Sequence, residues 1–344
     1  MCNAFIKNGC EVVLSLPKSN QISNNDFKYC VDYRDSLFQS KTFSKYLNST
    51  AIKKQTNEFQ PDIIYLRSPS LLHAALRTNS SIIVELHKDK LHSRFNLIDR
   101  YWEKLLVKGL KENQIKKVVC ISEALSKIWI KKGIPDDSII TEHDAINPKN
   151  FKNYKSNYKE GLNKNSTTIA YVGSLYKNRK IENIIILAEK FPKHNFLVIG
   201  GPNERANYFS RIVNDNQVQN IQFLGPVPHD KVSQYLFQSD ILLALWSSKV
   251  PTMDYCSPLK IFEYMAAGKI IVAHGFPPIK EVLKDGYNAI LSNPDDIDDL
   301  ITKTDYAIQL HKSGTNIDKQ AREDVLNNYT WEGRVKRILS HVGY

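Results

Sequence analysis

The 344-residue sequence lacks several features by which common protein classes are recognised. It has no run of about 18 uncharged apolar residues, so we expect no membrane-spanning helix, and its N-terminus lacks the basic-then-apolar pattern of a signal peptide. Its five cysteines never form a C-x-x-C pair, which argues against a disulfide framework and against a zinc site. The sequence therefore predicts a cytoplasmic protein with free thiols and no bound metal.

The sequence does contain enough hydrophobic residues to form the cores of two domains. Hydrophobic residues make up 42% of the chain and charged residues 24%, and a length of 344 residues suggests two domains. Short β-branched runs alternate with helical patterns in the first half, and the same alternation begins again at Thr168. A polar stretch at 147–167 separates the two series and is predicted to be a linker. We expect an α/β protein with two doubly wound units that face each other.

Individual strands and helices can be placed from these patterns. The expected strands are residues 11–16, 62–66, 82–86, 118–121, 139–142, 168–172, 195–199, 221–224, 241–245, 270–273 and 289–291, with clear helices at 181–190 and 231–238. The chain opens on the pattern of the second half of a helix that ends at Gly9. An α/β unit normally opens on a strand, so the first strand is expected to be missing, through truncation or because the domain lacks it.

The net charge of +11 is concentrated in the first half of the chain. Residues 1–150 carry 23 Lys and Arg against 16 Asp and Glu, an excess of +7, most of it in the segment 88–132. There, basic residues interleave with apolar ones at helical spacing, which suggests peripheral contact with an anionic membrane surface or a lipid-phosphate acceptor. An ordinary solvated helix face explains the pattern equally well. No nucleic-acid-binding motif is present, so we expect no nucleic-acid partner.

The segment from Ser257 to Gly268 predicts a site for a diphosphate. Ser257 and Pro258 form a helix start, in which serine caps backbone N–H groups and proline occupies the first helical position. The amides near Leu259 and the ammonium of Lys260 would then meet an anion at the positive end of the helix. Glu263 follows where a carboxylate can accept hydrogen bonds from ribose hydroxyls. The alternative is a well-capped helix that serves packing only.

A second candidate segment follows the expected strand 168–172. Gly173 and Ser174 stand at the carboxyl end of that strand, where ligands bind in open α/β sheets. Arg179 and Lys180 come shortly after and could offset the charge of a departing nucleotide diphosphate. Exposed loops often carry such cations, so the segment gains weight mainly from its pairing with the Ser257 helix.

At this point the sequence resembles the family-4, or group 1, retaining glycosyltransferases of the GT-B architecture. The likeness extends over nearly the whole chain and rests on several segments in the same order. These segments are PDIIYLRS at 61–68, VELH at 84–87, ISEAL at 121–125, GIP at 133–135, HDAIN at 143–147, YVGSL at 171–175, GPVPH at 225–229, SPLKIFEYMAAG at 257–268 and YTW at 329–331.

The resemblance implies two Rossmann-like domains that face a cleft. They would be an acceptor domain at 1–150 and a nucleotide-sugar domain at 151–326, followed by a helix at 327–344 that returns to the first domain. It further implies transfer of a hexose from a UDP- or GDP-sugar with retention, without a metal or other cofactor. Arg179 and Lys260 would hold the diphosphate and Glu263 the ribose. His87 would lie beside the sugar or acceptor, and backbone near Val227 would contact the base.

Arg67 and Ser68, in the PDIIYLRS segment, are accordingly assigned to the acceptor side. The sequence departs from the family pattern at two positions of the second domain. The first of two paired glutamates is replaced by Tyr255, with Asp254 adjacent, so sugar recognition is expected to differ. Ser174 stands where the family often has arginine, which leaves more charge compensation to Arg179. The missing first strand also removes the glycine-rich loop that usually contacts the donor.

The expected function is transfer of a sugar from a nucleotide-diphosphate donor to a glycan or lipid-linked acceptor, in synthesis of a surface polysaccharide. The protein would work in the cytoplasm, with peripheral contact at the inner face of the membrane through residues 88–132. Two alternatives remain open. The same architecture serves non-hydrolysing sugar-nucleotide epimerases, and a truncated, inactive paralogue could persist as a nucleotide-sugar-binding partner subunit.

Overall fold

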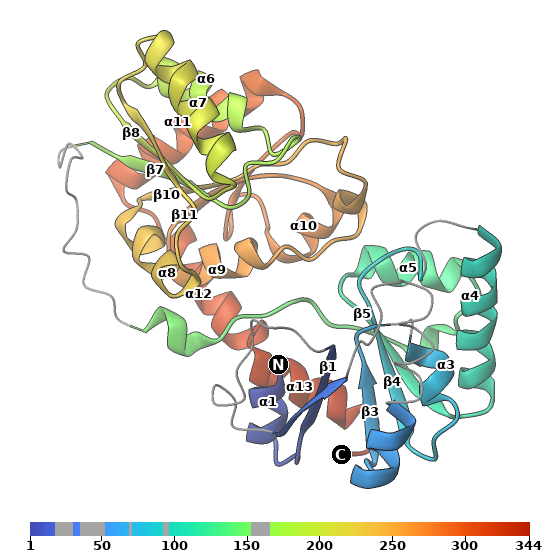
Figure 1. Ribbon diagram of the computed structural model, residues 1–344. Helices are drawn as coiled ribbons and strands as arrows, with labels where there is room; N and C mark the ends of the chain where they lie inside the picture. Colours follow the sequence, from blue (N-terminus) through green and yellow to red (C-terminus); the bar gives the residue numbers. More distant parts are fainter. Residues whose placement is uncertain (18–29, 35–51, 69–70, 92–95, 153–165) are drawn as a thin grey trace. The chain divides into compact units, whose positions relative to one another are not determined.

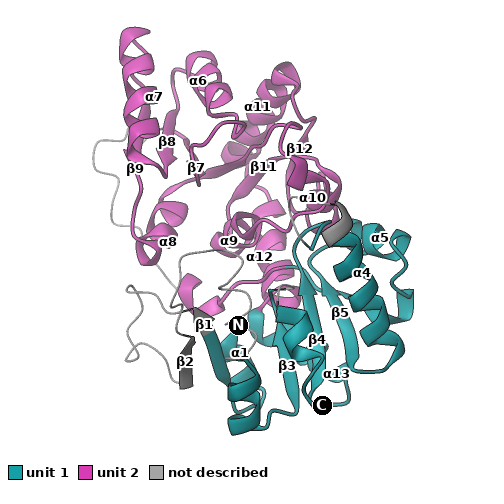
Figure 2. Cartoon of the chain, turned by 45° about the vertical axis from the view of Figure 1, so that its right-hand side comes forward, with its two compact units in different colours: residues 1–143, 331–344 teal, residues 144–330 magenta. Residues whose placement is uncertain are grey.

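The computed structural model describes residues 1–17, 30–34, 52–68, 71–91, 96–152 and 166–344 (Figure 1). The chain divides into two compact units (Figure 2). Unit 1 contains residues 1–143 and 331–344, and unit 2 contains residues 144–330. Unit 1 is therefore built from two segments of chain that flank unit 2.

Unit 2 is built on a six-stranded sheet in the order β12-β11-β10-β7-β8-β9, and all neighbouring strands are parallel. The strands are β7 (Thr168–Val172), β8 (Asn195–Ile199), β9 (Ile221–Gly225), β10 (Ile241–Ala244), β11 (Ile270–His274) and β12 (Ile290–Ser292). This is the Rossmann order, whose topological switch point lies between β7 and β10. All residues of β7, β10 and β11 are buried, because helices cover both faces of these central strands.

Two apolar clusters lie on the opposite faces of this sheet, and the alternation along β7 shows which residue faces which cluster. Ala170 and Val172 pack with residues of α8 (His229–Gln238), α9 (Leu259–Ala267) and α12 (Ile317–Asn328). Ile169 and Tyr171 pack with residues of α6 (Ile181–Lys190), α7 (Asn203–Asp215) and α11 (Ile297–Ser313). Figure 1 shows these two helix layers on either side of the sheet. The remaining elements are η4 (Pro148–Phe151), η5 (Pro251–Asp254) and α10 (Pro277–Val282).

Unit 1 contains a four-stranded parallel sheet in the order β3-β4-β5-β6, together with a separate parallel pair, β1 and β2. The strands are β1 (Val13–Pro17), β2 (Cys30–Arg34), β3 (Ile63–Leu66), β4 (Ser81–Leu86), β5 (Ile115–Cys120) and β6 (Ile139–Thr141). The helices are α1 (Cys2–Lys7), α3 (Leu72–Ala75), α4 (Asn96–Lys111), α5 (Glu123–Lys131), η3 (Asp136–Ser138) and α13 (Trp331–Ser340). From α13, Ile338 packs against β4, β5 and β6, and Leu339 packs beside Ala4 of α1.

The expected α/β class with parallel sheets is confirmed, and each strand expected from the sequence is present within a few residues. β2 was not expected. The opening helix ends as its sequence suggests, with Gly9 at φ +85°. Within the expected linker, residues 148–151 form a 3-10 helix with Phe151 buried, whereas residues 153–165 lie outside the described part.

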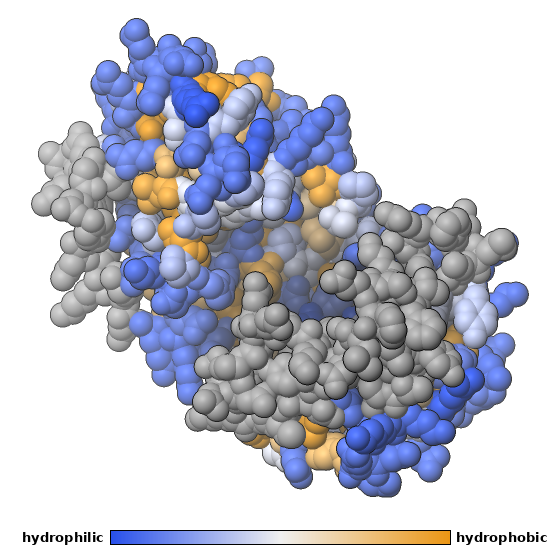
Figure 3. Space-filling model, viewed as in Figure 1, coloured by the Kyte–Doolittle hydropathy of each residue, from blue (hydrophilic) through white to orange (hydrophobic). Residues whose placement is uncertain are grey.

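Two observations concern membrane contact: the length and hydropathy of the helices, and the hydropathy of the surface. In the part of the chain that the structure describes, no helix is both long and apolar enough to cross a bilayer. The face of unit 2 seen in Figure 3 is mostly hydrophilic, with apolar residues in small separate patches.

Candidate nucleotide site and a polar cluster in unit 1

The candidate nucleotide site lies at the switch point of the unit 2 sheet. Gly173 directly follows β7, and its N–H donates to the carbonyl of Ile199 at the end of β8, at 2.9 Å. Gly200 follows β8 at φ +140°, and a Cβ added there would lie 1.7 Å from the carbonyl oxygen of Gly173. The two loops can pass this closely only because Gly200 has no side chain. This close approach lies at the carboxyl ends of the strands, where ligands bind in such sheets.

Lys260, in the first turn of α9, reaches this point with its ammonium group. Its Nζ is shielded from solvent and has no hydrogen-bond partner among the described residues, although the residue as a whole is half-buried. Nζ lies 4.0 Å from the ring centre of Tyr171 and 5.1 Å from that of Trp246, which follows β10. A Cβ on Gly173 would lie 2.6 Å from Nζ. The ammonium is thus held beside the loop that follows β7.

Lys260 has no ion-pair partner among the residues that the structure describes. Burial, and secondly the charge of Arg179, lower the pKa of Lys260 to about 7. Arg179 is half-buried in the loop that precedes α6. Glu263 acts in the opposite direction, but among the described residues Nζ has no hydrogen-bond or ion-pair partner. A buried cation without a counter-ion is costly, so the arrangement suits a bound anion.

Glu263 lies on α9 one turn beyond Lys260. Burial raises the pKa of Glu263, and the charges of His229 and Lys260 offset part of this effect. Its carboxylate is half-buried rather than enclosed. A carboxylate in this position can accept hydrogen bonds from neutral hydroxyls.

The start of α9 corrects the helix cap expected from the sequence. The helix begins at Leu259 with Pro258 as its N-cap, and no side chain caps it. Ser257 is buried, and its Oγ accepts a hydrogen bond from the N–H of Asp144 at 2.9 Å. The expectation was wrong because a residue distant in the sequence takes the serine hydroxyl. The helix does end at Gly268, which has φ +62°.

Tyr264 fixes α9 to the sheet and was not singled out from the sequence. Its hydroxyl accepts from the N–H of Val172 at 2.8 Å and lies 3.1 Å from the carbonyl oxygen of the same residue. Both bonds are buried at the last residue of β7. Lys260, one turn earlier on α9, is therefore held at a fixed height above the strand end.

Three other predicted donor residues have different surroundings. Lys180 forms an ion pair with Asp295 at 2.5 Å, and Asp295 also accepts from the N–H of Ser248 at 3.0 Å. The carbonyl of Ser174 accepts a hydrogen bond from the hydroxyl of Tyr171 at 2.9 Å. Val227 is half-buried against the apolar cluster that contains α8 and α9. Lys180 is thus neutralised within the protein, whereas Lys260 is not.

The departure at Tyr255 is also visible. Tyr255 is buried directly after η5, whereas the neighbouring Asp254 is exposed. A buried phenol thus stands where the resemblance leads us to expect the first of the paired glutamates, and the adjacent carboxylate lies at the surface.

The predicted residues of unit 1 meet at the carboxyl ends of β3 and β4. His87 and Arg67 both contact the fully buried Glu85: His87 Nε2 lies 2.6 Å and Arg67 Nε lies 2.9 Å from Glu85 Oε1. Ser68 follows Arg67, and its carbonyl accepts from the N–H of Leu71. Arg67 and His87, proposed from the sequence, thus share one buried carboxylate.

Arg334 of α13 completes this cluster and was not expected from the sequence. It is fully buried, with one guanidinium nitrogen 3.1 Å from Glu85 Oε2. Its other nitrogens donate to the carbonyls of Glu142 and His143, at the end of the first segment of unit 1. The neighbouring Arg337 binds the Glu142 carboxylate through two nitrogens, at 2.7 and 2.8 Å. Charge-assisted hydrogen bonds therefore hold α13 to the first segment of unit 1.

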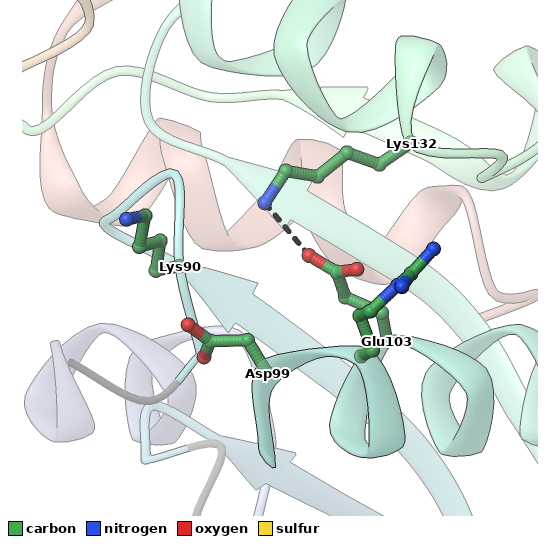
Figure 4. A pocket seen from close by; sticks show the side chains of 5 residues that line it. Lys90, Asp99, Glu103 and Lys132 are labelled. Carbon is green, nitrogen blue, oxygen red and sulfur yellow. Dashed lines mark hydrogen bonds and ion pairs between the residues drawn. The ribbon is translucent and has the colours of Figure 1, made fainter. Parts of the chain in front are cut away.

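The basic segment 88–132 forms α4, α5 and a strand between them. Trp129 is fully buried, and its Nε1 donates to the carbonyl of Lys88 at 3.0 Å. A cavity of about 300 Å³ in this segment is lined by Lys90, Asp99, Arg100, Glu103 and Lys132 (Figure 4). Lys132 pairs across it with Glu103 at 2.8 Å. The charges in this cavity largely compensate one another.

Comparison with known proteins agrees with this geometry. Residues 154–324 match the model of the family described as glycosyl transferases group 1. An uncharacterized glycosyltransferase of Methanocaldococcus jannaschii is 27% identical over 257 residues, which cover 72% of this chain and 63% of that protein. A subunit of phosphatidylinositol N-acetylglucosaminyltransferase of Saccharomyces cerevisiae is 23% identical over 253 residues, which cover 71% of this chain and 54% of that protein. The matches thus span less than two thirds of either relative.

The fold matches as well. The structure of the Anabaena protein HepE in complex with UDP superposes with a TM-score of 0.71 at 15% sequence identity, covering 91% of this chain and 86% of that one. The family match covers the unit that carries the switch-point site. Residues 154–324 thus match the group 1 glycosyltransferases, and the chain has the fold of the GT-B architecture.

Proposed function

We propose that this protein transfers a hexose-type sugar from a UDP- or GDP-sugar to a glycan or lipid-linked acceptor, with retention of anomeric configuration. The observation that carries the proposal is Lys260, whose ammonium is buried at the switch point of the unit 2 sheet with no hydrogen-bonding or ion-pair partner among the described residues. A diphosphate there would supply the missing charge, with help from Arg179. The UDP complex of HepE, a protein of the same fold, supports a nucleotide ligand.

In this proposal the other donor residues complete the contact with the nucleotide. Backbone at Gly173 and Ser174 and at the start of α9, from Ser257 to Leu259, faces the phosphates, while Glu263 accepts hydrogen bonds from the ribose. Val227 contacts the base through its backbone. Lys180 acts indirectly, because its pair with Asp295 holds the loop that carries Arg179.

The chemical step needs no metal in this proposal. The bond between the anomeric carbon and the diphosphate oxygen breaks, and the nucleoside diphosphate leaves with the electron pair. The acceptor oxygen bonds to the same face of the carbon, and its proton passes to the departing diphosphate. Lys260 and Arg179 stabilise the charge that grows on that diphosphate. His87, Arg67 and Ser68 serve the sugar and acceptor side.

Incubation with a panel of nucleotide sugars, with and without glycan and lipid-linked acceptors, tests the proposal. We expect calorimetric binding of one nucleoside diphosphate and acceptor-dependent nucleotide release, with both reduced by Lys260→Met and unchanged by Lys190→Met, a change on the exposed end of α6. Sugar isomerisation without acceptor would identify an epimerase instead. Binding without turnover would identify a partner subunit, and failure to bind every nucleotide would overturn the proposal.

A lipid-linked acceptor at the inner face of the membrane is part of the same proposal. Lys104, Lys108 and Lys111 are exposed on α4, so that this helix presents cations to solvent. A relative whose name includes phosphatidylinositol adds support. Co-sedimentation with anionic and neutral vesicles provides the test: we expect salt-sensitive binding to anionic vesicles only, weakened when the three lysines are replaced by glutamine.

A further inference from the structure

Glu85 receives polar contacts from four side chains, although it is fully buried. Arg67 Nε and His87 Nε2 contact Oε1, at 2.9 and 2.6 Å. The Tyr65 hydroxyl and Arg334 contact Oε2, the latter at 3.1 Å. The two oxygens thus have separate sets of partners, and the set on Oε1 contains the two residues assigned to the acceptor side.

The carboxylate of Glu85 is ionised at neutral pH. Burial by itself would raise the pKa of Glu85, but the hydrogen bond with His87 and the charges of Arg334 and Arg67 outweigh burial and hold the pKa well below its usual range. An ionised carboxylate has only acceptor sites. Every group in contact with it must therefore bring its own hydrogen.

This requirement determines the state of the His87 ring. At 2.6 Å from a carboxylate oxygen, Nε2 must carry the hydrogen of the bond. In a neutral imidazole the lone pair then lies on Nδ1, which becomes an acceptor. Arg67 Nη2, which can only donate, also lies 3.1 Å from Nε2, but the contact of Nε2 with the Glu85 carboxylate is shorter and requires the hydrogen on Nε2. The side chain of His87 is 31% exposed, so a ligand can reach the ring.

We propose that Glu85 is a positioning residue, which fixes the Nε2–H tautomer of His87 and leaves Nδ1 to accept a hydrogen bond from a hydroxyl of the sugar or acceptor. Arg334 holds Glu85 in place from α13. The contact of Arg334 with Oε2 would by itself be enough to anchor α13. The other oxygen, Oε1, instead accepts hydrogen bonds from Arg67 and His87 at the ends of β3 and β4. The identity of the hydroxyl rests on the function proposed above, whereas the tautomer does not.

Long-range proton–nitrogen NMR spectra of the full chain labelled at histidine test the tautomer directly. We expect His87 in the wild type to show a protonated Nε2 and an unprotonated Nδ1. Glu85→Gln should produce a mixture of both tautomers for His87 alone, with His73 and His229 as internal controls. Tyr65→Phe, which removes a contact on Oε2 only, should leave the tautomer unchanged.

The charge left on Arg334 could unfold the Glu85→Gln variant. The double variant Glu85→Gln with Arg334→Met removes both buried charges, and circular dichroism then verifies the fold before the spectra are compared. An unprotonated Nε2 in the wild type, or a single unchanged tautomer in a folded Glu85 variant, would overturn the proposal.

An activity measurement separates this inference from the proposed function. In a turnover assay, loss of Glu85 should lower kcat at least tenfold while the Kd for the nucleotide, measured by calorimetry, stays within twofold. An unchanged kcat in a folded Glu85 variant would contradict the positioning role. If the wild type turns over no nucleotide sugar, the proposed function fails, but the NMR result still decides the tautomer.

Discussion

The Nζ atom of Lys260 lies 4.0 Å from the ring centre of Tyr171, so that a strand residue and a helix residue of unit 2 form a cation–π pair at the switch point. Such pairs contribute about 0.5–2 kcal/mol. That gain does not replace the hydration and hydrogen bonds that a buried ammonium loses. A bound anion would therefore stabilise the buried ammonium of Lys260, and this stabilisation should be visible in nucleotide affinity and in protein stability.

The first prediction concerns pH and nucleotide binding. The pKa of Lys260 is lowered to about 7 by burial and by Arg179. A bound diphosphate favours the charged form and raises this pKa, so binding takes up a proton between about pH 7 and the raised value. Affinity should then fall as pH rises above 7. Calorimetry of UDP and GDP binding at pH 8 in buffers of different ionisation enthalpy measures the uptake; zero uptake there would refute this account.

The second prediction separates binding from stability. Lys260→Met removes an ammonium that costs folding energy and keeps most of the volume between the rings of Tyr171 and Trp246. We expect the free energy of unfolding at pH 7 to rise by about 1–3 kcal/mol, while nucleotide affinity falls by about 10- to 100-fold. Urea denaturation and calorimetry measure the two quantities. A loss of both stability and affinity would show that Lys260 is mainly structural.

The third prediction concerns the close approach of the loops after β7 and β8. A Cβ at Gly200 would lie 1.7 Å from the carbonyl oxygen of Gly173, so Gly200→Ala must displace backbone. We expect a loss of about 2–4 kcal/mol in unfolding free energy and weaker nucleotide binding. Gly286→Ala is the matched control, because φ there is also positive, +73°, but no atom lies within 4 Å of the added Cβ. Equal losses in the two variants would attribute the effect to φ alone.

The fourth prediction concerns acid stability of unit 1. The folded-state pKa of Glu85 lies below that of the unfolded chain, so its contribution to stability is present above about pH 4.5 and is lost as pH falls below it. Arg334→Met leaves the buried carboxylate without its fully buried guanidinium partner and should cost about 3–5 kcal/mol at pH 7.

The same substitution should also move acid unfolding, followed by circular dichroism from pH 7 to 2, to a higher pH, because the pKa of Glu85 rises. Lys7→Met breaks only an exposed pair with Glu332 and serves as the control. An unchanged acid midpoint in Arg334→Met would contradict the role given to this pair.

The strands of both sheets could be predicted from the sequence because most are buried on both faces and form short, nearly continuous apolar runs. The residues 168–172 and 181–190 coincide with β7 and α6. β2 escaped prediction because its five residues, CVDYR, contain two charges and show no such run.

The residues of the candidate site could be predicted where they lie close together in the sequence. Lys260 and Glu263 follow from one helix whose end is marked by Gly268. The serine cap failed because the hydroxyl of Ser257 bonds to Asp144, a residue that no local pattern connects with it.

The sequence also cannot distinguish the roles of Lys180 and Arg179, because their partners are distant in the chain. Only the folded chain brings Asp295 to Lys180 and leaves Arg179 near Lys260. The contact between Glu85 and Arg334 likewise joins positions 249 residues apart. Tertiary partners of this kind decide which charged residues are neutralised and which remain available.

The position of Arg334 also sets an order of events during synthesis. Residues 144–330 leave the ribosome before residues 331–344, so unit 2 can fold while unit 1 still lacks its last helix. Until α13 emerges, Glu85 and Glu142 have no arginine from that helix, and the face of β4, β5 and β6 that Ile338 covers remains open. Unit 2 is thus expected to fold first, and the His87 cluster to assemble only when the second segment of unit 1 joins the first.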